Sequence, residues 1–447
     1  MPNIRRQTIA MIFLAALTAG SVRRVAVAQL PCLASDVCLL ESNADAIRAR
    51  VRLINVAAER IDLASYAVDT GTVSLGLLEL MCEAAGRGVR ARLLVDAMQT
   101  DLPPSLASLL CSRGVEVRFY HPIRVTQPLE INQRMHVKLL VVDRQAMVIG
   151  SRNLQDSHFG LEEVNFVDFD VAVGGPICER ASAYFDRLWS SDEVEPSEPY
   201  RGEKRSLLPG GRGEKDDQQQ LTPLQWQARM AQARENVLAI AAECGASERG
   251  GCVAQVSSYL VSDATADKST DLIQDQIVAM IDSARHCVAL ETPYPVFSHA
   301  MFAALRRAEE RGVDVMLLTN SLRSTDRVAV YAAYHNDKFR LLRIGVKLYE
   351  FDSSDHLHAK TLIVDDRIAL VGSHNFDSRS DRFNLELGVA LVDPQTVSLV
   401  RESFQRRLAR GRQIDSPLEV IDAPGEDSRR LQLSIRRLTV NLYRIFL

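Results

Sequence analysis

The feature that most constrains this chain is a motif of the form HxKxxxxD, which occurs twice. The first copy is HVKLLVVD (His136 to Asp143), and the second is HAKTLIVD (His358 to Asp365). Each copy is followed by G-S-x-N, and the separation from histidine to asparagine is 17 residues in both (153 − 136 and 375 − 358). One short motif can arise by chance, but two copies with the same tail at the same spacing indicate a duplicated functional unit.

These residue types suit the cleavage and re-formation of a phosphodiester, which is an anion. Lysines neutralise the non-bridging oxygens, and hydroxyl and amide groups donate hydrogen bonds that tighten in the transition state. Because imidazole titrates near neutral pH, one histidine can attack phosphorus while the other, protonated, donates its proton to the leaving alcohol. The candidate catalytic residues are His136, Lys138, Asp143, His358, Lys360 and Asp365, and the candidate phosphate-binding residues are Ser151, Asn153, Ser373 and Asn375.

This scheme gives a phosphohistidine intermediate, which divides one difficult displacement into two easier ones. It requires no metal and no other cofactor, because the lysines and the protonated histidine supply the positive charge. Both motifs are predicted to be buried strands with the histidine and lysine on one face. Asp143 and Asp365 would lie at the far ends of these strands, where we expect them to organise the strand turn rather than to act on the substrate.

With these motifs the chain resembles the phospholipase D superfamily, and within it the bacterial cardiolipin synthase-like phospholipases. The resemblance is carried by RMHVKLLVVDRQAMVIGSRNLQDSHFG, LHAKTLIVDDRIALVGSHNFDSRSDRFNLELGVAL, RIGVKLYEF and FDRLWSS. It implies phosphatidyl transfer or phospholipid hydrolysis, with His136 as the nucleophile and His358 as the acid and base. It also implies that Asp168 and Glu386, each at the start of the last strand of its half, hydrogen-bond a catalytic imidazole and fix its tautomer.

Other segments repeat with a similar offset. The motif histidines are 222 residues apart (358 − 136), and Gly88 in GRGVRARLLVD and Gly312 in ERGVDVMLLTN are 224 apart (312 − 88). Each half is predicted to alternate strands and helices, which favours an α/β fold with a mostly buried mixed sheet flanked by helices. Two such halves can pack about a pseudo-twofold axis with both motifs at the interface. One chain then supplies the whole site without an obligate partner chain.

Composition suggests where the segments begin and end. The polar run before residue 221 is rich in glycine, proline and charge, as in a linker, and the helix predicted over 222–243 would open the second half. The predicted order is a signal-like segment (1–28), an N-terminal half (40–190), a linker (191–220), a C-terminal half (221–412) and a basic amphipathic tail (413–447).

The N-terminus is typical of a secretory signal, because Arg5 and Arg6 precede a short apolar run that leads into small residues. That run is too short to span a bilayer as a helix. The alternative is an uncleaved, weakly anchored start. With cleavage, the protein is expected to be exported and to act as a peripheral protein on the periplasmic side of the cytoplasmic membrane.

The eight cysteines fit an oxidising compartment. Cys32 with Cys38, and Cys244 with Cys252, are close in sequence and could form disulfides. Two further cysteines lie in apolar repeats and are expected to be free core residues, namely Cys82 and Cys287.

The C-terminal tail places apolar residues at helical spacing beside arginines, namely Ile435, Leu438, Leu442 and Ile445. A basic amphipathic helix of this kind can lie in a lipid interface, or it can dock on the core of the protein itself. The net charge of −4 gives no global basic footprint for nucleic acid. The expected partners are therefore a phospholipid substrate and a membrane surface rather than nucleic acid.

The leading functional hypothesis is a phosphatidyltransferase that passes the phosphatidyl group to a glycerol-type alcohol. Hydrolysis of the same intermediate would instead release phosphatidic acid. A phosphodiesterase acting on nucleic acid and a catalytically silent membrane-binding protein are further alternatives, and two intact motifs weigh against the silent one.

Overall fold

The computed structural model describes residues 33–122, 132–197, 221–243, 251–263, 272–422 and 427–440. A single mixed sheet of 16 strands runs through both halves of the chain, in the order β10-β4-β3-β2-β6-β7-β9-β1-β11-β19-β17-β16-β12-β13-β14-β20. The signal-like segment and most of the predicted linker lie outside the described residues. Within the described residues, no helix combines the length and the apolarity that crossing a bilayer would require.

The first half comprises β1 (Leu33–Leu40), α2 (Asn43–Val56), β2 (Arg60–Ser65), α3 (Thr72–Gly86), β3 (Arg90–Asp96), α4 (Pro104–Ser112), β4 (Val115–Tyr120), β5 (Arg134–Met135), β6 (Lys138–Val142), β7 (Ala146–Gly150), the 3-10 helix η3 (Asp156–Phe159), β8 (Phe166–Val167), β9 (Asp170–Gly174), α5 (Ile177–Trp189) and β10 (Val194–Pro196). It is followed by α7 (Pro223–Glu243).

The second half comprises β11 (Cys252–Ser262), α8 (Leu272–Asp282), β12 (Cys287–Glu291), α9 (His299–Glu310), β13 (Asp314–Asn320), α10 (Val328–Arg343), β14 (Lys347–Phe351), β15 (His356–Leu357), β16 (Thr361–Val364), β17 (Ile368–Gly372), α11 (Ser378–Arg382), β18 (Asn384–Leu385), β19 (Leu387–Leu391), α12 (Pro394–Leu408) and β20 (Gly411–Ile414). The last helix is α13 (Asp427–Thr439).

The two halves have the same strand pairing. In the first half, β2, β3 and β4 are parallel, and β2, β6, β7 and β9 follow one another antiparallel. In the second half, β12, β13 and β14 are parallel, and β12, β16, β17 and β19 follow one another antiparallel. The duplication predicted from the repeated segments is therefore confirmed, and each motif strand occupies the corresponding place in its half.

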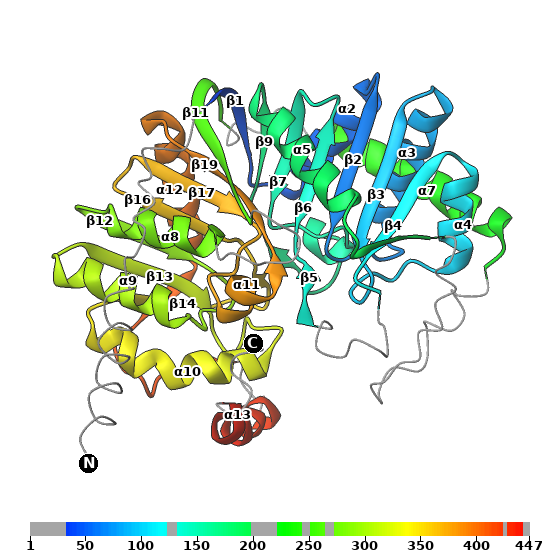
Figure 1. Cartoon of the computed structure of the whole chain (residues 1–447). Coiled ribbons are helices and arrows are strands. Elements are labelled where there is room, and N and C mark those ends of the chain that lie inside the picture. Colours follow the sequence, from blue (N-terminus) through cyan, green and yellow to red (C-terminus); the bar gives the residue numbers. More distant parts are fainter. Residues whose placement is uncertain are drawn as a thin grey trace, which may run out of the picture.

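The halves join where β1 and β11 pair antiparallel at the centre of the sheet (Figure 1). Cys38 and Cys252 are opposite each other in this pairing and form a disulfide. The expectation of pairs local in sequence was therefore wrong, because the strand register, and not the sequence spacing, brings the two thiols together. Cys32 and Cys244 lie outside the described residues. Cys82 is free and buried as expected, and Cys287 is free and half-buried.

Helix α7 packs on the first half rather than on the second half, where the sequence analysis placed it. Its buried side chains Trp226, Met230 and Val237 belong to the same apolar cluster as residues of α2, α3 and α4. The chain therefore crosses to the second half only after this helix.

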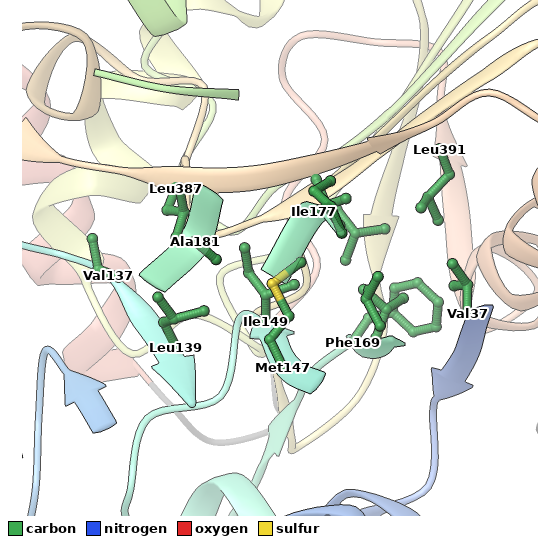
Figure 2. Packing of buried hydrophobic residues seen from close by; sticks show 14 of the residues in the cluster. Val37, Val137, Leu139, Met147, Ile149, Phe169, Ile177, Ala181, Leu387 and Leu391 are labelled. Atoms are coloured by element: carbon green, nitrogen blue, oxygen red, sulfur yellow. The ribbon is translucent and has the colours of Figure 1, made fainter. Parts of the chain in front are cut away.

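One apolar core is shared between the halves, and it lies beneath the two motifs. It contains Val137 and Leu139 from the first motif region, and Leu387 and Leu391 from β19 of the second half. Figure 2 shows these side chains together with Ile177 and others from the first half. Burying apolar area from both halves in one core fixes their relative position, and this position determines the geometry between the two motifs.

Candidate active site

Each motif histidine lies at a short strand junction that pairs with the opposite half. The backbone N–H of His136 donates to the carbonyl oxygen of Leu385 at 2.9 Å, and that of His358 donates to Val167 at 2.8 Å. Leu385 directly precedes Glu386, and Val167 directly precedes Asp168. The backbone pairing therefore places each histidine beside the acid of the other half.

The side chains complete this crossed arrangement. His136 Nδ1 lies 3.0 Å from Glu386 Oε2, and His358 Nδ1 lies 2.7 Å from Asp168 Oδ1. A carboxylate at Nδ1 favours the tautomer with its proton on that atom, which leaves Nε2 as the nitrogen available for chemistry. The structure thus brings both predicted orienting acids, Asp168 and Glu386, into contact with the two motif imidazoles.

The two acids are held in their ionised form. Both side chains are fully buried, and burial alone would raise the pKa of each carboxyl. The histidines beside each acid more than offset this effect, so the pKa of each acid lies below its usual range. These histidines are His136 at Glu386, and His158 and His358 at Asp168. Each motif histidine therefore faces a fixed negative charge.

Burial lowers the pKa values of the motif histidines and lysines, because it disfavours their charged forms. Burial lowers the pKa of His136 to about 4 and lowers the pKa of His358 well below its usual value, and in both cases the nearby lysines contribute further. Burial also lowers the pKa of Lys138 well below its usual value, and lowers the pKa of Lys360 to about 8. An arriving phosphodiester anion would favour the charged forms of both lysines and of the imidazole that serves as the acid.

The lysines are anchored to their own motifs. Lys138 Nζ donates to the carbonyl oxygen of His136 at 2.7 Å, and Lys360 Nζ donates to that of His358. Both side chains are almost fully buried, so their charge acts on the pocket at short range without being screened by bulk water.

Ser151 and Ser373 lie behind the acids, which differs from the phosphate-binding role expected for them. Ser151 Oγ donates to Asp168 at 2.6 Å, and Ser373 Oγ donates to Glu386 at 2.5 Å. Each hydroxyl also accepts the backbone N–H of the residue that directly follows the acid. Because their donor capacity is used, these serines hold the carboxylates in place.

Asn153 and Asn375 line a pocket of about 200 Å³, together with His136 and His358. The Oδ1 atoms of both asparagines are buried without a hydrogen-bond partner among the described residues. Buried polar atoms are normally paired, so two such amides facing one pocket fit a polar ligand. Small-molecule pockets typically measure about 300–1,000 Å³, and this smaller space suits a phosphate with a small alcohol.

Asp143 and Asp365 lie away from the pocket, which corrects their inclusion among the candidate catalytic residues. Asp143 accepts the backbone N–H groups of residues 58, 59 and 60 at 2.9, 2.8 and 2.8 Å. Asp365 accepts those of residues 285, 286 and 287 at 2.7, 2.7 and 2.9 Å. These carboxylates tie the far end of the motif strand to the start of the neighbouring strand, as expected from their position.

The sequence analysis missed a third histidine in the site. His158, on η3, places Nδ1 2.7 Å from Asp168 Oδ2, and its ring contacts the His358 ring at a centroid distance of 4.9 Å. The second half offers no repeat of this residue, because position 380 (158 + 222) is a serine. Comparison of the two repeats therefore could not identify it.

His158, Asp168 and His358 also form a group in which three ligand atoms lie within 4.8 Å of one another, close enough to hold a metal ion. Both Nδ1 atoms already contact Asp168 in this structure. A metal that used those atoms would displace the contacts that orient the imidazoles.

Aromatic and basic side chains also line the pocket, together with Asp326 and Asp377, and the repeated motifs gave no signal for the aromatic and basic ones. Tyr66 contacts the His136 ring edge-on at 4.6 Å and lies under the Lys138 ammonium at 4.8 Å. Arg327 and Arg379 line the pocket from the second half. The site therefore combines two oriented imidazoles with nearby cationic side chains, which suits an anionic ester.

Comparison with known proteins agrees with this geometry. A family described as "Cardiolipin synthase, PLD-like domain" matches residues 51–189 and 277–408. Cardiolipin synthase C of Escherichia coli K12 is 30% identical over 400 residues, which cover 82% of this chain and 83% of that protein. Cardiolipin synthase A of Pseudomonas entomophila is 26% identical over 411 residues, covering 90% of this chain and 74% of that protein.

The fold has a solved counterpart in phosphatidylserine synthase of Haemophilus influenzae Rd KW20. The TM-score is 0.70 at 15% identity, and the match covers 94% of this chain and 98% of that one. The family match spans both halves and includes both HxKxxxxD motifs. The chain therefore belongs to the phospholipase D superfamily, as an enzyme homologous to the cardiolipin synthases.

Proposed function

We propose that this protein is a phosphatidyltransferase that acts on phospholipid phosphodiesters through a phosphohistidine intermediate. The observation that carries the proposal is the pair of motif imidazoles on one small pocket, each held through Nδ1 by the acid of the other half. The names of the cardiolipin synthase relatives support a phosphatidyl donor.

In the first step, His136 Nε2 attacks phosphorus while His358, as imidazolium, donates its proton to the departing alcohol oxygen. The bond from phosphorus to that oxygen breaks, and the phosphatidyl group remains on His136. In the second step, His358 takes the proton of the incoming alcohol, whose oxygen attacks phosphorus and releases His136. Lys138, Lys360, Asn153 and Asn375 would stabilise the charge on the phosphoryl oxygens in both steps.

The acceptor distinguishes transfer from hydrolysis. A glycerol-type alcohol such as phosphatidylglycerol would give a new diester, whereas water would give phosphatidic acid. The arginines at the pocket, Arg327 and Arg379, support an acceptor that carries its own negative charge. The size of the pocket supports entry of the headgroup while the acyl chains stay outside.

The test is to incubate the purified protein with radiolabelled phosphatidylglycerol vesicles and to separate the lipid products. We expect a diphosphatidyl product from wild type, and loss of turnover by at least about 10³-fold in His136→Ala and in His358→Ala. The exposed His299 on α9 provides a matched control, and His299→Ala should retain activity. Phosphatidic acid as the sole product would assign hydrolysis, and near-wild-type activity in either motif mutant would exclude the two-histidine mechanism.

We further propose that the enzyme works on the periplasmic side of the cytoplasmic membrane and docks there through α13. This helix packs beside α10 (Figure 1) with Leu433 turned inward, and it exposes Leu431 by 63%, Ile435 by 56% and Leu438 by 85%. Those three positions lie on one helical face, and exposed arginines flank them. An apolar face with basic flanks suits an anionic lipid surface.

The position of α13 supports delivery of lipid to the pocket. Val440, just beyond the helix, is packed in one cluster with Tyr294 and Val330, which both line the pocket. Docking on the protein core and docking on a lipid surface thus both have support, since one face of α13 packs on the protein and the other face is exposed to solvent. Leu442 and Ile445 lie outside the described residues. The disulfide between Cys38 and Cys252 supports an oxidising compartment.

The docking test replaces Leu431, Ile435 and Leu438 together by serine. Burying a leucine or isoleucine side chain fully contributes about 1.5–3 kcal/mol. Each of these three side chains is more than half exposed and can be buried in the membrane. Their loss should therefore weaken binding to anionic vesicles by at least about 100-fold. Leu224→Ser, which alters an equally open leucine on α7 (74% exposed), is the control. Unchanged vesicle binding by the folded triple variant would show that α13 does not dock.

A further inference from the structure

Asn384 breaks the pseudo-twofold symmetry of the pocket. It begins β18 and lies two residues before Glu386. In the first half, Phe166 begins β8 and lies two residues before Asp168. Both of these side chains line the pocket. One half therefore presents an amide where the other half presents an aromatic ring, although the histidines, lysines, serines and acids of the two halves correspond.

The amide of Asn384 is held in one orientation. Its Nδ2 donates to Glu386 Oε1 at 3.3 Å, and because Glu386 is ionised, that carboxylate oxygen can only accept a hydrogen bond. The other end of the amide is therefore the acceptor oxygen Oδ1. This atom is buried without a hydrogen-bond partner among the described residues, and the whole residue is only 3% exposed.

A buried acceptor of this kind normally finds a donor, and only one part of the reactants can provide it. The phosphodiester and the acyl esters of a phospholipid have no O–H or N–H group, so they offer acceptors only. The headgroup alcohol carries hydroxyl groups. Asn384 and both motif histidines surround one space of about 200 Å³, so a second hydroxyl close to the reacting oxygen of that alcohol can reach Asn384 Oδ1.

The surroundings favour a hydroxyl over an ammonium group as the donor. A buried ammonium needs a negative charge beside it, and the two acids that line the pocket already have partners. Asp326 accepts from the hydroxyl of Tyr294 at 2.7 Å. Asp377 accepts the backbone N–H of Ser380 at 2.6 Å. Because Asn384 Oδ1 is uncharged, it can accept from a neutral hydroxyl without leaving a buried charge uncompensated.

We propose that Asn384 is a specificity-determining residue whose Oδ1 accepts a hydrogen bond from the hydroxyl next to the reacting hydroxyl of the acceptor alcohol. The acceptor class is then a vicinal diol, as at the end of a glycerol headgroup. This rests on the proposed transfer from phosphohistidine, whose chemistry it leaves unchanged. The reacting hydroxyl gives its proton to His358, its oxygen bonds to phosphorus, and the bond from phosphorus to His136 breaks. A diol held at two points is oriented for this attack, whereas a simple alcohol is held at one.

The test is the partition of one phosphohistidine intermediate between two alcohols. The purified protein is incubated with soluble short-chain phosphatidylglycerol and equal concentrations of propane-1,2-diol and propan-1-ol, and the two phosphatidyl alcohols are quantified by mass spectrometry. We expect wild type to favour the diol by at least about tenfold, the effect of one hydrogen bond to a buried neutral acceptor. Asn384→Leu, which has a similar shape but no acceptor, should lose this preference. Asn384→Asp keeps an acceptor oxygen and should retain it.

Ser373→Ala is the matched control. Ser373 also donates to Glu386 but does not line the pocket, so its loss weakens the support of that acid without touching the alcohol. The variant should turn over more slowly and give the wild-type product ratio, because the ratio does not depend on how fast the intermediate forms.

Two further alcohols test the donor in wild type, and they keep the proposal falsifiable if no variant folds. An ether oxygen in 2-methoxypropan-1-ol cannot donate, and 2-aminopropan-1-ol carries an ammonium group, so neither should be used better than propan-1-ol. Equal use of the diol and the ether, preference for the amine, or the same change of ratio in Asn384→Leu and Ser373→Ala would overturn the proposal. Phosphatidic acid as the sole product would overturn the proposed transfer as well, whereas transfer without preference overturns this inference alone.

Discussion

Replacing Glu386 by glutamine tests whether the crossed acid is needed for the charge on His136. The substitution keeps the shape of the side chain and removes its charge. At the 3.0 Å separation of His136 Nδ1 and Glu386 Oε2, Coulomb's law with an effective dielectric constant of about 20 gives about 5 kcal/mol between imidazolium and carboxylate. Part of this attraction is already present as a hydrogen bond in the neutral state, so about 3–4 kcal/mol of transition-state stabilisation should be lost.

That loss corresponds to a fall in kcat of about 10²–10³-fold. The assay is single-turnover cleavage of a soluble diester at pH 7, corrected for folded protein by circular dichroism. The correction matters because His136 lowers the pKa of Glu386, so ionised Glu386 also stabilises the fold at this pH, an effect lost as the pH falls below the usual carboxyl range. Activity within tenfold of wild type in the folded variant would refute the electrostatic argument.

Three further outcomes follow from the same geometry. Asp365→Ala should lower the free energy of unfolding by about 1–3 kcal/mol, because three backbone N–H groups lose their acceptor. Its kcat per folded molecule should stay within about threefold of wild type, and a much larger fall would indicate a catalytic role. Cys38→Ser should reduce stability, by at most about 5 kcal/mol from the chain entropy of a 214-residue separation, and an unchanged chemical denaturation midpoint would contradict this. Activity should persist in excess EDTA, since lysine and imidazolium supply the charge; loss that a divalent ion restores would point to a metal on His158, Asp168 and His358.

The repeated pattern predicted the architecture because each repeat carries its own local signals. Strand periodicity placed His136 and Lys138 at the start of a buried strand, and β6 begins at Lys138. The orienting role of Asp168 and Glu386, which lie just before β9 and β19, was instead implied by the resemblance to the phospholipase D superfamily. The strand inference uses only residues close together in sequence and their copies in the other half.

Features that depend on the register between distant strands could not be predicted in this way. The pairing of Cys38 with Cys252 depends on β1 and β11 meeting in one register. The hydroxyl of Ser151 turns to Asp168 because β7 and β9 are neighbours, and spacing alone could not separate that role from phosphate binding. His158 has no counterpart in the second repeat, so only its contact with Asp168 in the structure identified it as part of the site.

The crossing of acids and histidines couples catalysis to the contact between the halves. His136 has its acid on the second half and His358 has its acid on the first, so neither half alone contains an oriented motif imidazole. A shift of one residue in the pairing of β5 with β18 or of β15 with β8 would move the acid to the opposite face of its strand. The continuous sheet, the shared apolar core and the Cys38–Cys252 disulfide at the seam all oppose such a shift. The interactions that hold the two halves in register are therefore also the interactions that keep the imidazoles oriented.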